Sequence, residues 1–350
     1  MTDSGSSGPI ISGVRGDFAM PADAHDDPEG VELVDQVEHR DVVVPSAQHG
    51  ARLDLALATL VPEFSRSYLQ QLIAAGVVQL AGRVQAKSSA KVKAGDALQI
   101  ELRPTPQSQA FKPEPMALDV VYEDDSLLVI NKPAGLVVHP APGNWSGTLL
   151  NGLLARDAQA ACLPRAGIVH RLDKDTSGLM VVAKQRVVMD RLVEMIAART
   201  VHREYVAIAH GAWVGAPVRQ VEAPIGRDPR NRLRMAVVDM DRHSGKSAST
   251  RISLMVNAAR HCLVACRLQT GRTHQIRVHM VHIGHPLVSD ALYGGEAAGG
   301  LTRQALHACR LAFEHPVSGQ AVDLRVPPPD DFQSAAAALG LGYNWASSHL

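Results

Sequence analysis

The chain has 350 residues, of which 46% are apolar and 20% charged, and this balance excludes collagen, coiled coils and global disorder. Basic and acidic residues number 35 each, and the resulting net charge of zero by itself argues against a nucleic-acid-binding protein. The zero is an average, because residues 1–45 hold two arginines and ten acids (net −8), and the other 305 residues hold 33 bases and 25 acids (net +8). We therefore expect a basic body behind an acidic N-terminal arm.

The cysteine and hydropathy patterns indicate a protein of the cell interior. Four cysteines include no CxxC pair, which predicts reduced thiols and a cytoplasmic location. The N-terminus lacks the basic-then-apolar pattern of a signal peptide, and no run of 18 apolar residues predicts a membrane span. Residues 1–45 are rich in Ser, Gly, Asp and Glu without apolar periodicity, so we expect a disordered acidic arm there.

Residues 46–103 have the pattern of a small domain with two helices and a small sheet. Apolar residues from Leu53 to Phe64 recur at helical spacing, and a second helix is expected from an N-cap at Ser65 to a terminating glycine, Gly76. Strands are expected over 77–80, from Arg83, and over 97–102. This is about the minimum size of a unit that folds alone.

Four prolines among polar residues predict an extended linker over 104–115. From 116 to 330, strand-like runs, including a hairpin over 118–130, alternate irregularly with a few helices, so we expect an α+β domain with a mixed, mainly antiparallel sheet. Helices are expected over 188–196 and over 274–283, the second capped by Thr273. The tail, 331–350, is expected to be a short Ala-rich helix or a frayed end.

The densest candidate for chemistry is Gly167–Gly178, a polar loop directly before an apolar strand. Asp173 has Arg171 and Lys174 as sequence neighbours, and nearby cations favour an ionised carboxylate, a candidate nucleophile or base. The same spacing fits an ordinary turn with solvated charges, so spacing alone leaves both interpretations open.

Two further segments carry candidate residues. On a strand over 202–207, Arg203 and Tyr205 share a face, where a tyrosine can stack on a base or move a proton; an ordinary packed tyrosine is the alternative. On the helix after Thr273, periodicity places Arg277 near the core boundary, where a cation needs an acidic partner; a surface arginine is the alternative.

We expect neither a metal nor a nucleotide cofactor. The four histidines between 274 and 285 do not have the i, i+4 spacing of helical zinc ligands, and no thiolate pair accompanies them. The chain also has no Gly-rich phosphate-binding loop.

Basic residues gather in both predicted domains. Such runs are more often solvated faces, but two of them in separate modules favour RNA as the partner. The candidate RNA-binding residues are Arg66, Arg83, Lys87, Lys91, Arg171, Arg227, Arg230, Arg232, Arg272 and His274.

Several segments match family motifs over roughly residues 50–328: His170-Arg-Leu-Asp173 with the following Thr-Ser-Gly, Asn131–Gly135, Thr270–His279 and Pro286–Gly294. Together they resemble the RluA-type RNA pseudouridine synthases, a specific likeness because the shared signature is long. The small domain, with Arg52-Leu-Asp54, Ser65-Arg-Ser67 and Gly95-Asp96, resembles an S4 RNA-binding domain.

The resemblance implies the pseudouridine synthase fold and the isomerisation of uridine to pseudouridine in 23S rRNA, in the helix 69 stem-loop. It implies that Asp173 is the catalytic carboxylate, that Arg277 pairs with it and that Tyr205 contacts the base. The implied partner is 23S rRNA or the assembling large ribosomal subunit, and we expect a monomer. Three alternatives stay open: a different rRNA or tRNA uridine, a non-catalytic RNA-binding protein, and a hydrolase that uses Asp173 with Asp175.

Overall fold

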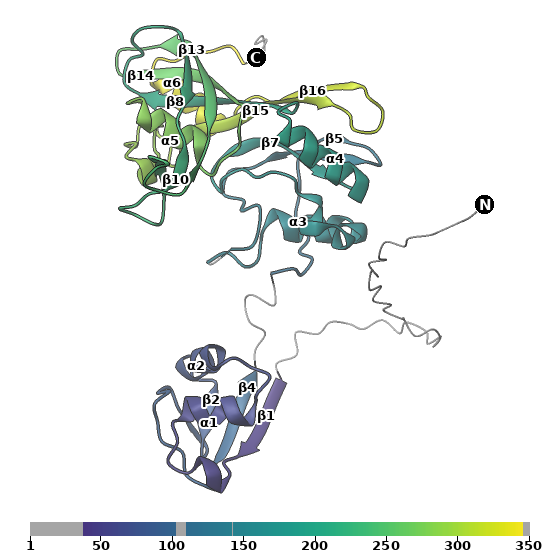
Figure 1. Ribbon diagram of the computed structural model, residues 1–350, viewed down its shortest axis with the longest axis vertical. Coiled ribbons are helices and arrows are strands. Elements are labelled where there is room, and N and C mark those ends of the chain that lie inside the picture. Colours follow the sequence, from purple (N-terminus) through teal and green to yellow (C-terminus); the bar gives the residue numbers. More distant parts are fainter. Residues whose placement is uncertain (1–37, 103–109, 142, 346–350) are drawn as a thin grey trace, which may run out of the picture. The chain divides into compact units, whose positions relative to one another are not determined.

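The computed structural model describes residues 38–102, 110–141 and 143–345 (Figure 1). The chain divides into two compact units between Arg103 and Pro104, called here the N-terminal and C-terminal units. Most of the predicted acidic arm, residues 1–37, lies outside the described residues. Among the residues that are described, no helix combines the length and apolar character needed to cross a membrane.

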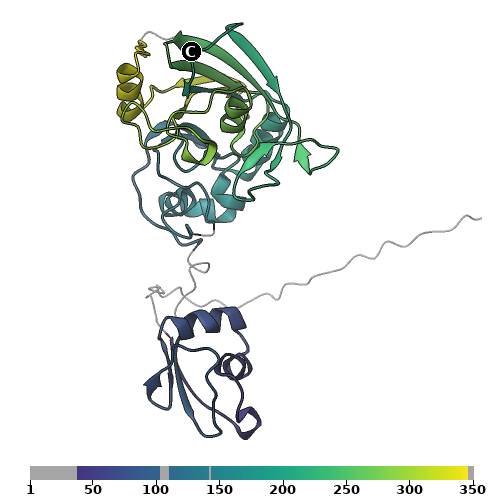
Figure 2. The same ribbon diagram turned by 90° about the vertical axis from the view of Figure 1, so that its left-hand side faces the viewer.

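The N-terminal unit is a four-stranded antiparallel sheet with two helices packed on it (Figure 2). The strand order is β1-β4-β2-β3. Its elements are β1 (Glu38–Val43), α1 (Leu53–Leu60), α2 (Arg66–Ala74), β2 (Val78–Leu80), β3 (Arg83–Val84) and β4 (Ala97–Leu102). As predicted, the Ser65 hydroxyl accepts a hydrogen bond from the Tyr68 amide at the start of α2, and Gly76, with φ of +72°, follows its end.

Strand β1 corrects the predicted boundary of the arm at residue 45, which is wrong. Residues 38–43 pair with the whole of β4, from Glu38 opposite Leu102 to Val43 opposite Ala97. β1 lies at the sheet edge and none of its six side chains is buried. The strand is held by backbone hydrogen bonds rather than by buried side chains. Its sequence therefore has no apolar alternation from which a strand could be predicted.

Asp54 of α1 is fully buried and organises the polar side of the N-terminal unit. Arg52 and Arg66 each donate two hydrogen bonds to its carboxylate, at 2.8–3.2 Å, and Gln70 donates a fifth at 2.6 Å. The hydrogen bonds of Arg52, then of Arg66 and Gln70, outweigh burial and hold the pKa of Asp54 well below its usual range. Two donor nitrogens of Arg66, a candidate for RNA binding, are therefore engaged inside the protein.

The C-terminal unit is built on a nine-stranded sheet, in the order β5-β6-β7-β15-β8-β14-β13-β9, with β16 beside β15. All its pairs are antiparallel except β7 with β15. The predicted α+β class with a mixed, mainly antiparallel sheet is confirmed. Its strands are β5 (Val120–Glu123), β6 (Leu127–Lys132), β7 (Ser177–Ala183), β8 (His202–His210), β9 (Val218–Glu222), β13 (Ser249–Asn257), β14 (His261–Leu268), β15 (Leu306–Glu314) and β16 (Ala321–Arg325).

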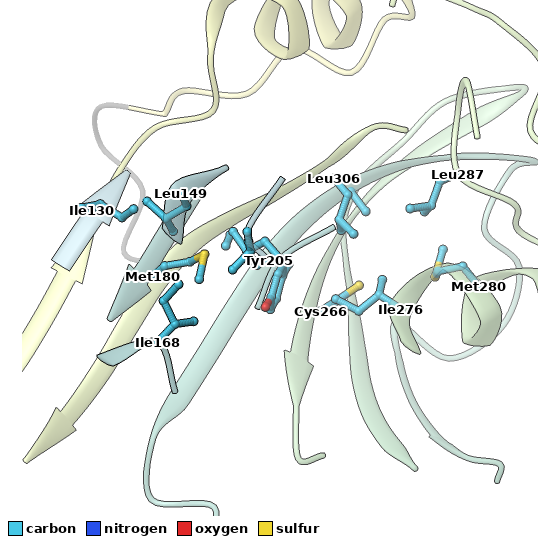
Figure 3. Close-up of a cluster of buried hydrophobic side chains, with 14 of the residues drawn as sticks. Ile130, Leu149, Ile168, Met180, Tyr205, Cys266, Ile276, Met280, Leu287 and Leu306 are labelled. Carbon is cyan, nitrogen blue, oxygen red and sulfur yellow. The ribbon is translucent and has the colours of Figure 1, made fainter. Parts of the chain in front are cut away.

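Helices cover both faces of this sheet, because its strands alternate buried side chains between the two. On β8, Tyr205 and Ala207 face one apolar cluster, with α3 and α5, while Val206 and Ile208 face another, with α6. Figure 3 shows Tyr205 in the first cluster, with Ile168 and Met180 on one side and Cys266 and Ile276 on the other. The helices are α3 (Leu149–Arg156), α4 (Arg186–Ala197), α5 (Gln275–His282) and α6 (Asp330–Ala338). A small sheet of β10 (Ile225–Arg227), β11 (Met235–Val237) and β12 (Gly245–Lys246) lies beside α5.

Three sequence predictions in this unit need correction. Residues 110–115 of the predicted linker are anchored, since Ala110 is buried and Asn151 of α3 binds the Ala110 and Lys112 carbonyls. The Ala-rich helix predicted for the tail is confirmed as α6, but it belongs to the unit, because it buries Phe332, Ala335 and Ala336 in a cluster with β8. Thr273 does not cap α5; the N-cap is His274.

Candidate active site

A cavity of about 860 Å³ in the C-terminal unit brings together the three predicted catalytic residues, Asp173, Tyr205 and Arg277. Asp173 lies in the loop before β7, Tyr205 on β8 and Arg277 on α5. The cavity between these elements is therefore the candidate active site. Its described lining holds one carboxylate, that of Asp173, among six arginines: Arg165, Arg171, Arg199, Arg203, Arg272 and Arg277. A strongly positive cavity thus exists in a chain whose net charge is zero.

Asp173 lies on a turn that is closed by a hydrogen bond from the Thr176 amide to the Asp173 carbonyl at 3.1 Å. A turn is one of the two interpretations of this segment, the other being a catalytic loop. The Asp173 carboxylate is not simply solvated: the side chain is 17% exposed, and Oδ2 accepts a hydrogen bond from the Arg277 guanidinium at 3.1 Å. Its Oδ1 lies 3.8 Å from Nε2 of His274, beyond hydrogen-bond range. One oxygen is therefore oriented by a cation, while the other is left to the cavity.

Arg277 is 6% exposed and is held from behind by Asp290. Its Nε and one terminal nitrogen donate to the two Asp290 oxygens at 2.7 and 2.8 Å, and the remaining terminal nitrogen donates to Asp173. Burial alone would lower the pKa of this guanidinium, but the hydrogen bonds and charges of Asp290 and Asp173 raise its pKa instead. The sequence indicated that Arg277 needs an acidic partner but did not identify Asp290 as one.

His274 stands at the N-cap of α5 with left-handed backbone, φ +56°. Its Nδ1 lies 2.8 Å from the Tyr293 hydroxyl, and this hydroxyl accepts from the Met235 amide at 3.0 Å. The Tyr293 hydroxyl therefore has its own proton to donate to Nδ1, an arrangement that puts the imidazole proton on Nε2, toward Asp173. Burial lowers the pKa of His274, which favours the neutral ring.

Tyr205 is 5% exposed, and its ring belongs to both the apolar cluster and the cavity wall. Burial raises the pKa of its hydroxyl to about 12, so the phenol is neutral at physiological pH. Two residues before it, Arg203 is also buried, and its Nε has no hydrogen-bond partner among the described residues. A side-chain carbon at Gly271 would come within 2.8 Å of the Arg203 guanidinium, so glycine there gives it room.

The Asp173 loop is clamped by Lys132, from the motif Asn131–Gly135 to which the sequence assigned no role, and by Arg303, which no sequence pattern singled out. Lys132 is fully buried, and its ammonium donates to three carbonyls, including that of Lys174 at 3.0 Å. Arg303 donates to the Asp175 carbonyl at 3.1 Å. At the end of the loop Gly178 has φ of +114°, and a side-chain carbon there would lie 2.2 Å from the Ala308 carbonyl, so only glycine fits this crossing. The backbone directly after Asp173 is therefore held by hydrogen bonds and close packing.

The candidate RNA-binding residues divide into three places. Arg171, Arg272 and His274 line the cavity. Arg227, Arg230 and Arg232 are exposed around the turn between β10 and β11. The N-terminal unit holds Arg66, Arg83, Lys87 and Lys91, of which Lys91 donates to the Gly50 carbonyl.

The structure gives other roles to two groups weighed in the sequence. His279 is buried between the Thr250 hydroxyl and the Ala223 carbonyl, at 2.9 and 3.0 Å. The described residues contain no group of three or more His, Cys, Asp or Glu side chains placed to hold a metal ion. Asp175 does not line the cavity, so the carboxylate pair of the hydrolase alternative is not assembled there.

Comparisons with known proteins point to one family. Residues 126–282 match the family model described as RNA pseudouridylate synthase. The chain is 46% identical over 336 residues to ribosomal large subunit pseudouridine synthase D of Neisseria meningitidis serogroup A, covering 93% of this chain and 88% of that protein. It is 47% identical over 313 residues to the protein of the same name from Xanthomonas campestris, covering 86% and 92%. A solved structure, human RNA pseudouridylate synthase domain containing 1, covers 63% of this chain and 90% of its own, at 25% identity and a TM-score of 0.50.

Proposed function

The chain belongs to the RNA pseudouridylate synthase family, and we propose that it converts uridines of 23S rRNA to pseudouridine with Asp173 as the catalytic carboxylate. The enzyme is an isomerase, so substrate and product have the same atomic composition. The observation that carries the proposal is the Asp173 carboxylate itself, oriented by buried Arg277 through one oxygen and facing a positive cavity with the other.

The reaction breaks the bond between C1′ of the ribose and N1 of uracil, and it joins C1′ to C5. The C5 proton leaves and N1 gains a proton, so atoms and electrons balance without a cofactor. Breaking the first bond develops oxocarbenium-like charge on the sugar, and a carboxylate beneath C1′ stabilises that charge or bonds to it. Arg277 donates a hydrogen bond to the Asp173 carboxylate and so fixes its direction.

Tyr205 contributes a ring and a hydroxyl at the same cavity. Because the phenol stays neutral, its ring can stack on the detached uracil while its hydroxyl takes part in proton transfer at C5 or N1. The apolar wall around it keeps water from the sugar, which would otherwise be hydrolysed at C1′. Confinement of the free base is as necessary as the nucleophile.

The target we propose is an unpaired loop uridine of 23S rRNA, in the helix 69 stem-loop, either free or in the assembling large subunit. The relatives from Neisseria and Xanthomonas are named for the large ribosomal subunit. A loop base leaves its stack at low cost and can enter a cavity that a paired base cannot reach. The arginines that line the cavity attract the flanking phosphates, and the S4-like N-terminal unit adds contacts through its basic residues. We place the enzyme in the cytoplasm, as a monomer.

The test is pseudouridine mapping of total RNA from a strain that lacks the gene, complemented with wild type, with Asp173→Asn or with Asp175→Asn. We expect wild type and Asp175→Asn to restore the missing 23S rRNA pseudouridines, and Asp173→Asn to restore none. Asp175 is the matched control because it is two residues away but does not line the cavity. Rescue by Asp173→Asn would refute the catalytic role. Loss of tRNA or other rRNA sites instead would favour a different target, and an unchanged map would favour a non-catalytic RNA-binding protein.

A further inference from the structure

Two aromatic rings at the cavity are not used by the chemistry proposed above. Phe111 and Trp145 line it together with Tyr205, in a chain that has thirteen Phe, Tyr and Trp residues in all. Tyr205 is 5% exposed, whereas Phe111 is 68% exposed and is the one aromatic among the large exposed apolar side chains of the described residues. The cavity therefore has a buried aromatic group at its interior and an exposed one at its mouth.

The backbone that carries Phe111 is fixed on both sides. Asn151 of α3 donates through its side-chain amide to the Ala110 carbonyl at 3.2 Å and to the Lys112 carbonyl at 2.8 Å. Ala110 is buried, yet the ring between these two anchors is turned out to solvent. A phenyl ring that stays exposed contributes no burial energy to folding. A backbone held so that this ring faces solvent therefore favours a role in ligand binding over a role in packing.

The loop that carries Trp145 is tied to the same clamp. The Glu114 carboxylate accepts a hydrogen bond from the Gly147 amide at 2.8 Å, and the Glu114 amide donates to the Asn151 carbonyl at 3.0 Å. Both aromatic residues are thus connected to the start of α3 through short hydrogen-bonded paths. Rings on a fixed backbone lose little conformational entropy when a ligand stacks on them.

The charges around these rings identify the ligand class. Arg165 and Arg199, both exposed, line the same cavity, and Asp173 is the single carboxylate among its described lining residues. Aromatic faces beside guanidinium groups suit a nucleobase together with its phosphate. An acidic peptide would find the cations but would have no use for aromatic rings at the cavity, so the combination favours single-stranded RNA.

We propose that Phe111 and Trp145 form a stacking site for an unpaired nucleobase next to the target uridine, with Arg165 and Arg199 binding its phosphate. The proposal rests on the proposed function, because it assumes that the interior of the cavity holds the target uridine. The exposure of Phe111 assigns this second base to the mouth, and the cavity volume, toward the upper end for ligand sites, leaves room for more than one nucleoside. Part of the sequence selectivity of the enzyme then comes from stacking beside the target.

The test measures RNA affinity in the Asp173→Asn background, where binding is separated from turnover. The probes are a stem-loop copy of the 23S rRNA target and versions of it with one abasic nucleotide at each loop position in turn. We expect Phe111→Ala and Trp145→Ala to raise Kd roughly 5- to 100-fold, as loss of base stacking does. Phe111→Tyr should retain the affinity, whereas Phe111→Leu should not, because a flat ring rather than apolar bulk is required. Val317→Ala, at a residue that is 59% exposed outside this cavity, is the matched control and should change nothing.

An abasic nucleotide beside the target should weaken RNA binding by the Asp173→Asn protein as much as Phe111→Ala does. Combining the abasic probe with Phe111→Ala should cause no further loss of affinity. Unchanged affinity in both alanine variants, or equal loss with every abasic probe, would overturn the stacking site. A short oligouridylate separates this result from the proposed function. If wild type forms no pseudouridine in any RNA while oligouridylate binding still depends on Phe111, the stacking site stands and the proposed function fails.

Discussion

The N-terminal unit holds Asp54 and the C-terminal unit holds Asp173, and both carboxylates are paired with arginine. Asp54 is fully buried and accepts five hydrogen bonds, four of them from two arginines that are themselves 40% and 47% exposed. Asp173 is 17% exposed and accepts one side-chain hydrogen bond, from a buried arginine whose other nitrogens are committed to Asp290. The arrangements are opposite: in one the acid is enclosed by exposed cations, and in the other a buried cation presents the acid.

Under the proposed mechanism, the same kind of ion pair serves structure at Asp54 and chemistry at Asp173. A fully buried carboxylate that accepts five hydrogen bonds is closed to a substrate, whereas one oriented through a single oxygen keeps a free side. The cation also differs, because an arginine anchored by a second acid stays in position when the first one reacts. Enclosure of the carboxylate, rather than the presence of an ion pair, separates the two sites.

The largest effect that tests this contrast is expected from Asp173→Asn. Because the proposed mechanism assigns the chemistry to the free carboxylate oxygen, kcat for pseudouridine formation should fall on the order of 10³-fold or more. The lost hydrogen bond should cost only about 1 kcal/mol of folding free energy. Turnover and urea unfolding of the same preparation check both values. If Asp173→Asn strongly lowered the folding stability but left kcat unchanged, Asp173 would be a structural group like Asp54.

Arg277→Met should damage both activity and stability. It leaves Asp290, which is 1% exposed, as a buried charge without its partner, and this should cost about 3–5 kcal/mol of folding free energy. Denaturant unfolding of the variant and of Asp290→Asn, combined in a double-mutant cycle, measures the coupling. Additive losses would mean that Asp290 does not anchor Arg277.

Acid should affect the C-terminal unit before the N-terminal unit. Burial lowers the pKa of His307 to about 4 from 6.5, so between these values the unfolded chain binds more protons and stability falls as pH drops. The full effect is about 3 kcal/mol, reached near pH 4. The pKa of Asp54 is also lowered, from 3.8, so its contribution is present above pH 3.8 and is lost only below it.

The measurement is hydrogen exchange of peptides from each unit at pH 7 and pH 5, corrected for intrinsic rates. It shows which unit loses stability first as the pH falls. The C-terminal unit should lose protection at pH 5, and His307→Gln should reduce that loss. His282→Gln, at an exposed histidine, is the control. Equal loss in both units at pH 5 would contradict the assignment.

Asp54→Ala should have the smallest effect on the reaction. Five hydrogen bonds disappear, but the two arginines released are already partly solvated, so the N-terminal unit should lose about 1.5–3 kcal/mol. At saturating RNA, kcat should match wild type, because no reacting group has changed. Single-turnover assays measure this, and a large fall in kcat would require a catalytic part for the N-terminal unit.

Much of the site could be predicted from the chain itself. A polar loop before an apolar run indicated Asp173, strand alternation placed Tyr205 beside Arg203, and helical periodicity put Arg277 at the core boundary. Where prediction failed, the deciding interaction was long-range. Asp290 became a partner because η4 (Ala291–Tyr293) and its preceding turn lie against α5, and Lys132 reaches a carbonyl 42 residues away.

The failures in the fold have the same origin. β1 is polar and is held by backbone pairing with a strand more than 50 residues later, so no apolar period marked it. Residues 110–115 have the composition of a linker, yet one amide side chain of α3 fixes them and presents Phe111 at the cavity.

The sequence by itself determined which residues were available for chemistry, because local order sets turns, strand faces and helix periods within a few residues. Tertiary structure decided which of two aspartates beside arginines stays open to a substrate. That choice depends on how many donors reach each carboxylate and on which partner is buried. Arg277 and Asp173 lie 104 residues apart, and only the packing of α5 against the sheet brings them within 3.1 Å.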